Sequence, residues 1–507
     1  MGNSPYTAPI HILNDDSLLH VFISTRPLLS GEDEDESTRL IGGNERWDRS
    51  RWWYKLAHVC QRWRNVILES ASYLGLSLVC TYGTPVADML AHSPPLPLVI
   101  EYLNQYRDII EDEQDAFLAL NQRDRVHRVR LFMPVTSLQK LIGAMDEEYP
   151  VLDYLIIAPP PEDKSAILML PETLQAPHLR HLTLDGFALP IGSRLLTTSV
   201  GLVSLFLVFN DPSTYFHPNA LLRWLSFMPQ LEMLAIRFHL AVPNREIERQ
   251  LTRTPIITTV TLPNLHYFSF RGVCAYLEAL VHQITTPRLE KLQIDYFNQL
   301  TFSVPSLVQF MNTTEYFRFD SAELWFHAER IYLGVYSPGD ETKALIIGVP
   351  CWHLDWQISS VAQISNSLSH LLSAVEHLTL EHRIHSLTSE EHNKVDRTEW
   401  RKLLEPFGNA KTLLIGNGLV EQLSRCLELE DGELPLELLP ELQELTYSRS
   451  GDTSDAFTSF INARQKAGRP VTLVLESVED DPAPVSHAQG SSAVTSGSSE
   501  TGSNLDT

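Results

Sequence analysis

The chain has 507 residues, of which 43% are apolar, so it is long enough to exceed one ordinary domain and to bury a sizeable core. Its formal net charge of −24 argues against binding to nucleic acid or to an anionic membrane, because both need clustered Lys and Arg. The 5 cysteines are scattered and form no C-x-x-C pair, so neither a disulfide framework nor a zinc ribbon is supported.

Residues 1–9 are predicted to be a flexible N-terminus, and a small helical domain is predicted over residues 10–72. The sequence ILNDDSLLHVF predicts a helix whose N-terminus is capped by Asn14 or Asp15. In WWYKLAHVCQRWRNVIL, apolar residues three and four apart from Leu56 to Ile67 predict one amphipathic helix. An acidic insertion at about 26–51 separates the two stretches. Helices this short with such apolar faces need a partner surface, on another protein or on the rest of this chain.

The segment from Leu13 to Phe22 resembles the start of an F-box, and LAHVCQRWRNVIL resembles the V-C-x-x-W signature that ends one. The resemblance is to a large class of fungal F-box proteins with irregular repeats. It implies that the helices bind the Skp adaptor of an SCF-type cullin-RING ubiquitin ligase. By resemblance, the adaptor-facing and packing residues are Leu13, Leu18, Leu19, Val21, Phe22, Leu56, Val59, Cys60 and Trp63.

Two features depart from the F-box pattern. Asn14 stands where the family has a proline, and the acidic insertion divides the motif. They favour an alternative in which the helices have lost the adaptor and only cap the repeats that follow.

Residues 73–477 are predicted to form an irregular leucine-rich-repeat solenoid. A strand at 76–80, a helix at 85–91 and a strand at 96–102 would form its capping unit. The pattern apolar-x-x-apolar-x-apolar then recurs, with copies that start at Val126, Leu152, Leu179, Leu202, Leu231, Leu265, Leu289, Thr314, Val375, Ala410 and Leu442. A degraded copy is expected around residues 345–349. Most copies start about 23 to 35 residues apart, close to the period of leucine-rich repeats.

Helical stretches lie between the later copies, so the fold class is α/β, with parallel strands on the concave face and helices outside. Only Asn210 keeps the asparagine of regular repeats, so we expect an irregular coil. An ordinary α/β domain is the alternative fold. The last strand is predicted at 471–477, and residues 478–507 are predicted to be a disordered, acidic Ser/Gly-rich tail.

No catalytic, cofactor-binding or metal-binding motif is recognisable, so we predict that the chain is not an enzyme. The richest group of potential metal ligands runs from His377 to His392 and includes His382 and His385, which leaves a metal-dependent enzyme as an unfavoured alternative. The run RDRVHRVRL is a basic island that either meets an acidic substrate or pairs with neighbouring carboxylates.

The predicted function is substrate recognition for an SCF-type ligase, in the cytoplasm or nucleus, with no cofactor, nucleic acid or membrane partner. The substrate is an unidentified protein, which we expect to contact outward-facing residues of the concave strands. These are Arg128, Arg130, Tyr154, Phe206, Tyr267, Tyr316 and Arg318. A repeat scaffold without a ligase role is the main alternative.

Overall fold

The structure is a computed structural model. It describes residues 13–25, 51–103, 113–160, 163, 167–190, 192–239, 258–297, 299, 301–314, 317–336, 343–382, 396–416, 418–428, 434, 436–448 and 456–476. The predicted N-terminal segment 1–9, nearly all of the acidic insertion and the predicted tail 478–507 lie outside these ranges.

In the part of the N-terminal module that the structure describes there are four helices, namely α1 (Asp15–Thr25), α4 (Trp52–Ala57), α5 (Gln61–Glu69) and α6 (Ala71–Leu74). The cap of α1 is confirmed, since Asn14 Oδ1 accepts a hydrogen bond of 2.8 Å from the backbone N–H of Ser17. The prediction of one continuous helix from Leu56 to Ile67 is wrong. Cys60 adopts an extended conformation (φ −160°, ψ 168°), and its Sγ accepts from the backbone N–H of Trp63. Cys60 therefore caps α5 and ends the continuity with α4.

The solenoid is built on a 16-stranded sheet whose order is β1-β2-β3-β4-β6-β8-β9-β11-β13-β16-β15-β14-β17-β18-β19-β20. Its first nine strands in sheet order are β1 (Leu78–Cys80), β2 (Leu98–Leu103), β3 (Val126–Phe132), β4 (Tyr154–Ala158), β6 (His181–Asp185), β8 (Ser204–Phe209), β9 (Met233–Phe238), β11 (Tyr267–Gly272) and β13 (Lys291–Tyr296). The other seven are β16 (Lys343–Pro350), β15 (Arg330–Tyr336), β14 (Ser321–His327), β17 (His377–His382), β18 (Thr412–Ile415), β19 (Glu444–Ser448) and β20 (Thr472–Glu476). Two short parallel pairs, β5 (Leu168–Met169) with β7 (Phe187–Ala188) and β10 (Val260–Thr261) with β12 (Ile284–Thr285), lie outside this sheet.

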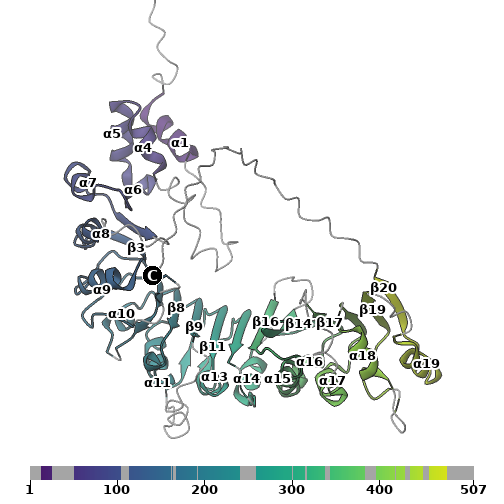
Figure 1. Cartoon of the computed structure of the whole chain (residues 1–507). Coiled ribbons are helices and arrows are strands. Elements are labelled where there is room, and N and C mark those ends of the chain that lie inside the picture. Colours follow the sequence, from purple (N-terminus) through teal and green to yellow (C-terminus); the bar gives the residue numbers. More distant parts are fainter. Residues whose placement is uncertain are drawn as a thin grey trace, which may run out of the picture.

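Helices connect the strands on the outer side of a curved sheet, so that the strands line the inside of an arc and the N-terminal module stands at one end (Figure 1). They are α7 (Val86–His92), α8 (Glu113–Leu120), α9 (Val135–Gly143), α10 (Arg194–Thr198), α11 (Pro218–Leu225), α13 (Cys274–Val281), α14 (Pro305–Asn312), α15 (Leu354–Ser367), α16 (Ser369–Leu372), α17 (Arg397–Leu404), α18 (Val420–Leu427) and α19 (Thr458–Lys466). The described connections also contain the 3-10 turns η3 (Pro212–Thr214) and η5 (Glu405–Phe407). No described helix is long and apolar enough to cross a membrane.

The repeat pattern follows the burial of each strand. In the copy that starts at Leu179, the three apolar positions Leu179, Leu182 and Leu184 are all buried, while His181 and Thr183 between them are half-exposed. Because strand side chains alternate between faces, the leucines point toward the helices and the others toward the concave side. Each buried leucine contributes about 1.5–3 kcal/mol through its apolar area. Their stacking makes one continuous core from the helical module to the last strand.

One part of the sheet departs from the predicted parallel order. β14, β15 and β16 form an antiparallel meander, and β16 lies beside β13 while β14 lies beside β17. The repeat copy predicted at Thr314 is wrong, because the described residues before β14 form no strand and the regular strand starts only at Ser321. The degraded copy expected around 345–349 does form a strand, β16, parallel to β13.

Asn210, the asparagine that matches regular repeats, donates from Nδ2 to Asp185 Oδ1 of the preceding repeat, 2.6 Å away. With nearly all its strands parallel and its motif leucines stacked, the chain is an α/β leucine-rich-repeat solenoid.

Candidate protein-binding surfaces

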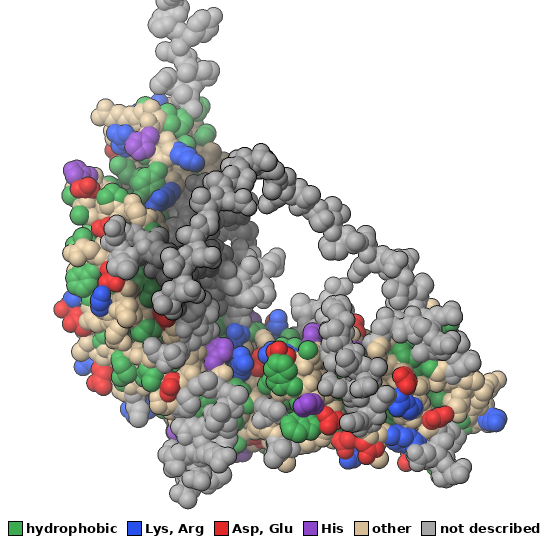
Figure 2. Space-filling view, in the orientation of Figure 1, with side chains coloured by type: hydrophobic (Ala, Val, Ile, Leu, Met, Phe, Trp, Pro, Cys, Tyr) green, Lys and Arg blue, Asp and Glu red, His purple; other side chains and the backbone are tan. Residues whose placement is uncertain are grey.

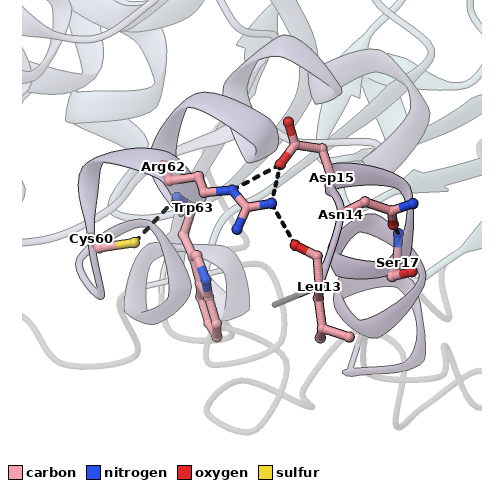
Figure 3. A network of polar contacts seen from close by, with 7 residues as sticks. All are labelled: Leu13, Asn14, Asp15, Ser17, Cys60, Arg62 and Trp63. Carbon is pink, nitrogen blue, oxygen red and sulfur yellow. Dashed lines mark hydrogen bonds and ion pairs between the residues drawn. The ribbon is translucent and has the colours of Figure 1, made fainter. Parts of the chain in front are cut away.

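Arg62 links helices α1 and α5 of the N-terminal module. Arg62 of α5 donates from Nε and Nη2 to Asp15 Oδ1 at 2.9 and 2.7 Å, and from Nη2 to the carbonyl oxygen of Leu13 at 2.6 Å. These contacts fix the start of α1 against α5 (Figure 3). Phe22 packs edge-on against Trp63, with ring centroids 5.1 Å apart, and completes the contact from the apolar side.

The nine residues assigned to the adaptor by resemblance fall into three groups. Leu18 and Phe22 have no exposed surface, so they pack inside the module. Leu13, Leu19, Leu56, Cys60 and Trp63 are half-buried, and Val21 and Val59 are exposed at 39% and 58%. Figure 3 shows the Leu13 and Trp63 side chains pointing the same way from neighbouring segments. The module therefore keeps apolar surface at its edge after its own core is filled.

The module also contacts the first repeat directly. Arg51 Nη2 donates to the carbonyl oxygen of Val79 at 3.3 Å and to Thr84 Oγ1 at 3.2 Å. Trp53 Nε1 donates to the carbonyl oxygen of Ser77, also at 3.3 Å. Because these acceptors lie in or beside β1, the helices cover the end of the solenoid core as well as presenting their own surface.

The concave wall is the second candidate surface, and the predicted residues lie on it in register. Arg128, Tyr154 and His181 are paired across β3, β4 and β6. The Arg128 guanidinium carbon lies 5.0 Å from the centroid of the Tyr154 ring, and the Tyr154 and His181 rings are 5.6 Å apart. Phe206 is half-exposed one row further along the same wall. Stacked cationic and aromatic side chains of this kind are common at protein interfaces.

Of the three predicted residues that come last in the sequence, Tyr267 lies further along the wall. Tyr267 Oη donates to Gln293 Oε1 at 3.1 Å, and Lys291 Nζ lies 5.9 Å from the centroid of the Tyr267 ring. Tyr316 is outside the described residues, and Arg318 is exposed in the loop that precedes β14 rather than on a strand. The loop position of Arg318 follows from the failure of the predicted copy at Thr314.

The basic run at 123–130 is largely engaged within the chain. Arg123 Nη2 lies 3.3 Å from Asp146 Oδ1, and Arg125 Nε donates to the carbonyl oxygen of Leu96 at 3.1 Å. Arg130 is only 4% exposed, and its Nη1 lies 3.7 Å from Glu101 Oε1, which is buried as well. Arg130 is therefore part of an internal ion pair, and the prediction that it is an exposed contact residue is wrong. Of this run, Arg128 faces the open wall.

The histidines considered for a metal site are only partly described. His377 Nδ1 lies 2.8 Å from Thr412 Oγ1, and His382 packs beside Gly418, whereas His385 and His392 are outside the described residues. Among the residues that the structure covers, no group of three or more His, Cys, Asp and Glu side chains could hold a metal ion.

Sequence reasoning missed the hairpin formed by β14 and β15, which places Trp325, Arg330 and Tyr332 on the same wall. Arg330 Nη1 donates to Tyr332 Oη at 2.5 Å and lies over the Tyr332 ring, with its guanidinium carbon 5.6 Å from the centroid. The sequence AELWFHAERIYLGVY does alternate apolar and polar residues in part. That alternation around a short turn is the signal of a hairpin, and the segment does not contain the leucine-rich-repeat pattern.

No protein-family profile matches this sequence, and no curated protein matches it either. Among solved structures, the crystal structure of the leucine-rich repeat-containing protein LegL7 from Legionella pneumophila matches. The match covers 80% of this chain and 91% of that chain, at 10% sequence identity and a TM-score of 0.23. A TM-score this low does not support any conclusion about the fold or function of this chain. The assignment as a leucine-rich-repeat solenoid rests instead on the strand order and the buried motif leucines.

Proposed function

We propose that this protein is a binding subunit with two surfaces, in which the helical module docks on a Skp-type adaptor and the concave wall holds a protein substrate. The chain would then be the substrate-recognition subunit of an SCF-type cullin-RING ubiquitin ligase. The observation that carries the proposal is the apolar edge of the module, where Trp63, Leu13 and Val59 keep exposed or half-exposed surface beside an F-box-like sequence.

The docking residues in this proposal are those whose side chains reach the surface. Burying apolar area stabilises a complex by about 25 cal/mol per Å², so only side chains that still have area to lose can contribute. Leu18 and Phe22 have none, and their role is to hold α1 against α5. The docking surface consists of Leu13, Leu19, Val21, Leu56, Val59, Cys60 and Trp63.

The mechanism is geometric. A rigid solenoid between two binding surfaces holds a captured substrate at a fixed distance from the adaptor, which raises the effective concentration of substrate lysines near a ubiquitin-loaded enzyme. The covalent chemistry belongs to the other subunits of the ligase, and this chain positions the reactants.

The test is a pull-down of the full chain with purified Skp adaptor. Val59→Asp places a charge on an exposed apolar position, so it should preserve the fold and lower the capture of adaptor at least tenfold. Val200→Asp is the matched control, because Val200 is also exposed, at 55%, but precedes β8 in the solenoid. Equal capture by both variants, or no capture by the intact chain at micromolar concentrations, would rule out the adaptor-binding role.

A second candidate function is a repeat scaffold whose helices only end the coil. The hydrogen bonds from Arg51 and Trp53 to the first repeat favour it, since they are what a capping module needs. In that case the intact chain binds no adaptor, and Arg51→Ala destabilises the first repeat. The pull-down separates the two functions.

A further inference from the structure

The two ends of the solenoid differ in how they are closed. At the first end, all residues of β1 are at most 1% exposed, and the helical module donates hydrogen bonds to the carbonyl oxygens of Ser77 and Val79. At the last end, Leu473 and Leu475 of β20 are 37% and 52% exposed. A repeat array needs a cap at each end, because the outer side of its terminal repeat otherwise leaves core surface in water.

Leu473 and Leu475 stand at core positions of the repeat. The strand register pairs Leu473 with Leu445 and Leu475 with Tyr447 of β19, and both of these partners are fully buried. Side chains alternate between the faces of a strand, so the two leucines point toward the layer of helices as their partners do. Among the described residues, β20 is the last strand of the large sheet. It is therefore an edge strand whose core-facing side chains are not yet covered.

The backbone of β20 also presents hydrogen-bonding groups at this edge. The N–H of Thr472 donates to the carbonyl oxygen of Gln443 at 2.8 Å, so Thr472 and Val474 direct their peptide groups toward β19. Successive residues of a strand turn their N–H and C=O groups to opposite edges. Those of Leu473 and Leu475 therefore point away from the sheet.

We propose that β20 pairs in antiparallel orientation with β20 of a second copy of this chain, about a two-fold axis at Val474. In this register Leu473 of each copy lies opposite Leu475 of the other, and each leucine donates and accepts one hydrogen bond through its outward-directed groups. A two-fold axis perpendicular to the sheet keeps the helices of both copies on the same side. The exposed leucines of both strands then meet in one core.

The strand is suited to a second copy because it is complementary to itself. Antiparallel pairing about Val474 places apolar side chains opposite apolar side chains and uses both residues whose peptide groups point outward. Each copy also offers the other the same kind of surface, namely the open end of a repeat core. One pairing thus closes both ends, and the closed symmetry leaves no further edge for a third copy.

Charge favours the same arrangement. Lys466 and Arg469 are exposed just before β20, and Arg469 pairs with Glu441 of its own chain at 3.3 Å. The acidic residues 479–481 follow the strand in the sequence. Antiparallel pairing brings the start of one strand beside the end of the other, so the basic and acidic stretches meet. Over the last helices, Figure 2 shows Lys and Arg interspersed with Asp and Glu, so the net charge of −24 is not concentrated on the visible face of this end.

The tail of the same chain is a poorer occupant of this edge. Pro482 and Pro484 have no N–H to donate to an edge strand. Beyond them, the apolar side chains larger than alanine are Val485, Val494 and Leu505, which stand 9 and 11 residues apart. A strand that covers a core needs apolar residues at every second position, so this tail does not supply one.

The first test is the mass of the full chain by sedimentation equilibrium between about 1 and 200 μM, at 0.15 M salt, where charges are screened beyond about 8 Å. One strand and one helix per copy bury less than a standard interface of about 1,600 Å², so we expect a micromolar dissociation constant. The mass should rise from 57.5 kDa toward twice that value. Leu475→Lys should raise the dissociation constant at least tenfold, because a lysine on an edge strand opposes pairing. Met169→Lys is the matched control, since Met169 is 53% exposed and lies in β5, outside the large sheet.

The second test is disulfide formation between engineered cysteines, which reports on the register. Val474→Cys should give a covalent dimer with oxidised glutathione as the oxidant. Opposed residues of a non-hydrogen-bonded pair have Cα atoms about 4.5 Å apart, which a disulfide can span. Thr472→Cys is the control, because residue 472 would lie about 13 Å along the strand from its symmetry mate. The unsubstituted chain accounts for any reaction of Cys60, which is half-buried.

Several results would overturn the proposal. They are a mass that stays at 57.5 kDa up to 200 μM, growth beyond a dimer, equal association of Leu475→Lys and Met169→Lys, or equal crosslinking of the two cysteine variants. Amide exchange of Leu473 and Leu475 should slow as the concentration rises. Slow exchange at every concentration would show that a segment of the same chain covers the edge, and would overturn the proposal as well.

The dimer is independent of the proposed adaptor binding. The helical module stands at the opposite end of the arc from β20 (Figure 1), so Leu475→Lys should capture the Skp adaptor as well as the unsubstituted chain does. Failure of the pull-down would leave the dimer standing, and a monomeric chain would leave the adaptor role standing. If both hold, one dimer carries a helical module at each end of a continuous concave wall.

Discussion

Arg464 offers the sharpest test of how the last repeats are held together. This arginine of α19 is fully buried, and it donates to the carbonyl oxygens of Leu439, Pro440 and Leu442 at 3.0, 2.9 and 3.1 Å. Leu439 has a positive φ of 50°, which an L-residue adopts only when its surroundings enforce it. The guanidinium therefore holds the turn that leads into β19.

The expected cost of Arg464→Met follows from these contacts. Each hydrogen bond to a charged group contributes about 1.5–3 kcal/mol, so three of them give roughly 4–9 kcal/mol. The variant also removes the penalty of burying a charge, which is several kcal/mol and is reflected in the lowered pKa of Arg464. The net loss should be about 2–4 kcal/mol, confined to the last repeats because each repeat contacts mainly its neighbours.

Native-state hydrogen exchange measures this loss locally. Amides of β19 and β20 should exchange about 30-fold to 700-fold faster in Arg464→Met, since every 1.4 kcal/mol is a factor of ten. Amides of β3 and β4 should keep their rates. Arg425→Met is the control, since Arg425 forms an exposed ion pair with Glu421 on the same part of the coil, and should change little. Unchanged exchange in β19, or equal acceleration along the whole chain, would refute the reasoning.

Three further outcomes are expected. Phe22→Ala should lower the free energy of unfolding of the helical module by about 3–5 kcal/mol, because Phe22 is fully buried. It should also shift the fluorescence of Trp63, the tryptophan of α5 that Phe22 contacts, to the red, and an unshifted spectrum would show that the ring contact is absent. Hydrogen bonds from Ser137 and Lys140 lower the pKa of Glu113, so the unfolded state binds the proton more tightly than the folded state does. The stability that this contact gives is therefore fully present above pH 4.5, the value for an unperturbed Glu, and is lost as the pH falls through the lower pKa of the folded state. Amide exchange in α8 should then rise on acidification in the native chain, with a smaller rise in Glu113→Gln. Burial raises the pKa of Cys80 to about 12, so this thiol should resist iodoacetamide at pH 8 until the chain unfolds, and fast labelling of the folded chain would contradict its burial.

The solenoid was predictable because its signal is repeated. A single apolar-x-x-apolar-x-apolar stretch fits many folds, but Leu152, Leu179, Leu202 and Leu231 each start a copy and each is buried in the structure. Stacking requires the same positions to face the core in every repeat, so the spacing of apolar residues within each copy is kept. The asparagine and the loop lengths are not under this constraint and vary between repeats.

The meander was not predictable by the same reasoning. Strand β15 has buried residues at alternate positions but no leucine repeat. Of its partners, β16 matches the expected degraded copy, whereas β14 starts beyond the copy predicted at Thr314 and was assigned to none. The pairing of strands depends on tertiary structure, because an alternation of buried and exposed residues in β15 is compatible with pairing to different neighbouring strands. The sequence therefore did not predict that Trp325, Arg330 and Tyr332 lie together on the concave wall.

In the helical module, too, residue spacing predicts less than the structure shows. Spacing identified the apolar residues of the module, of which Leu18 and Phe22 prove to be buried and Val59 exposed. It could not show that α4 ends at Ala57 and that Cys60 caps a separate helix, α5, since a cysteine cap has no sequence signal comparable to Ser or Asp. Burial separates side chains that stabilise the module from those able to contact a partner.

The order in which the meander strands lie has a consequence for synthesis. After β13 leaves the ribosome, the edge that it exposes stays open until β16 emerges, because β14 and β15 take places further along the sheet. Repeats before this point can form one after another, whereas the second half must wait for a hairpin to assemble and fit between β13 and β17. Truncations after β13 should consequently leave this edge exposed and aggregate.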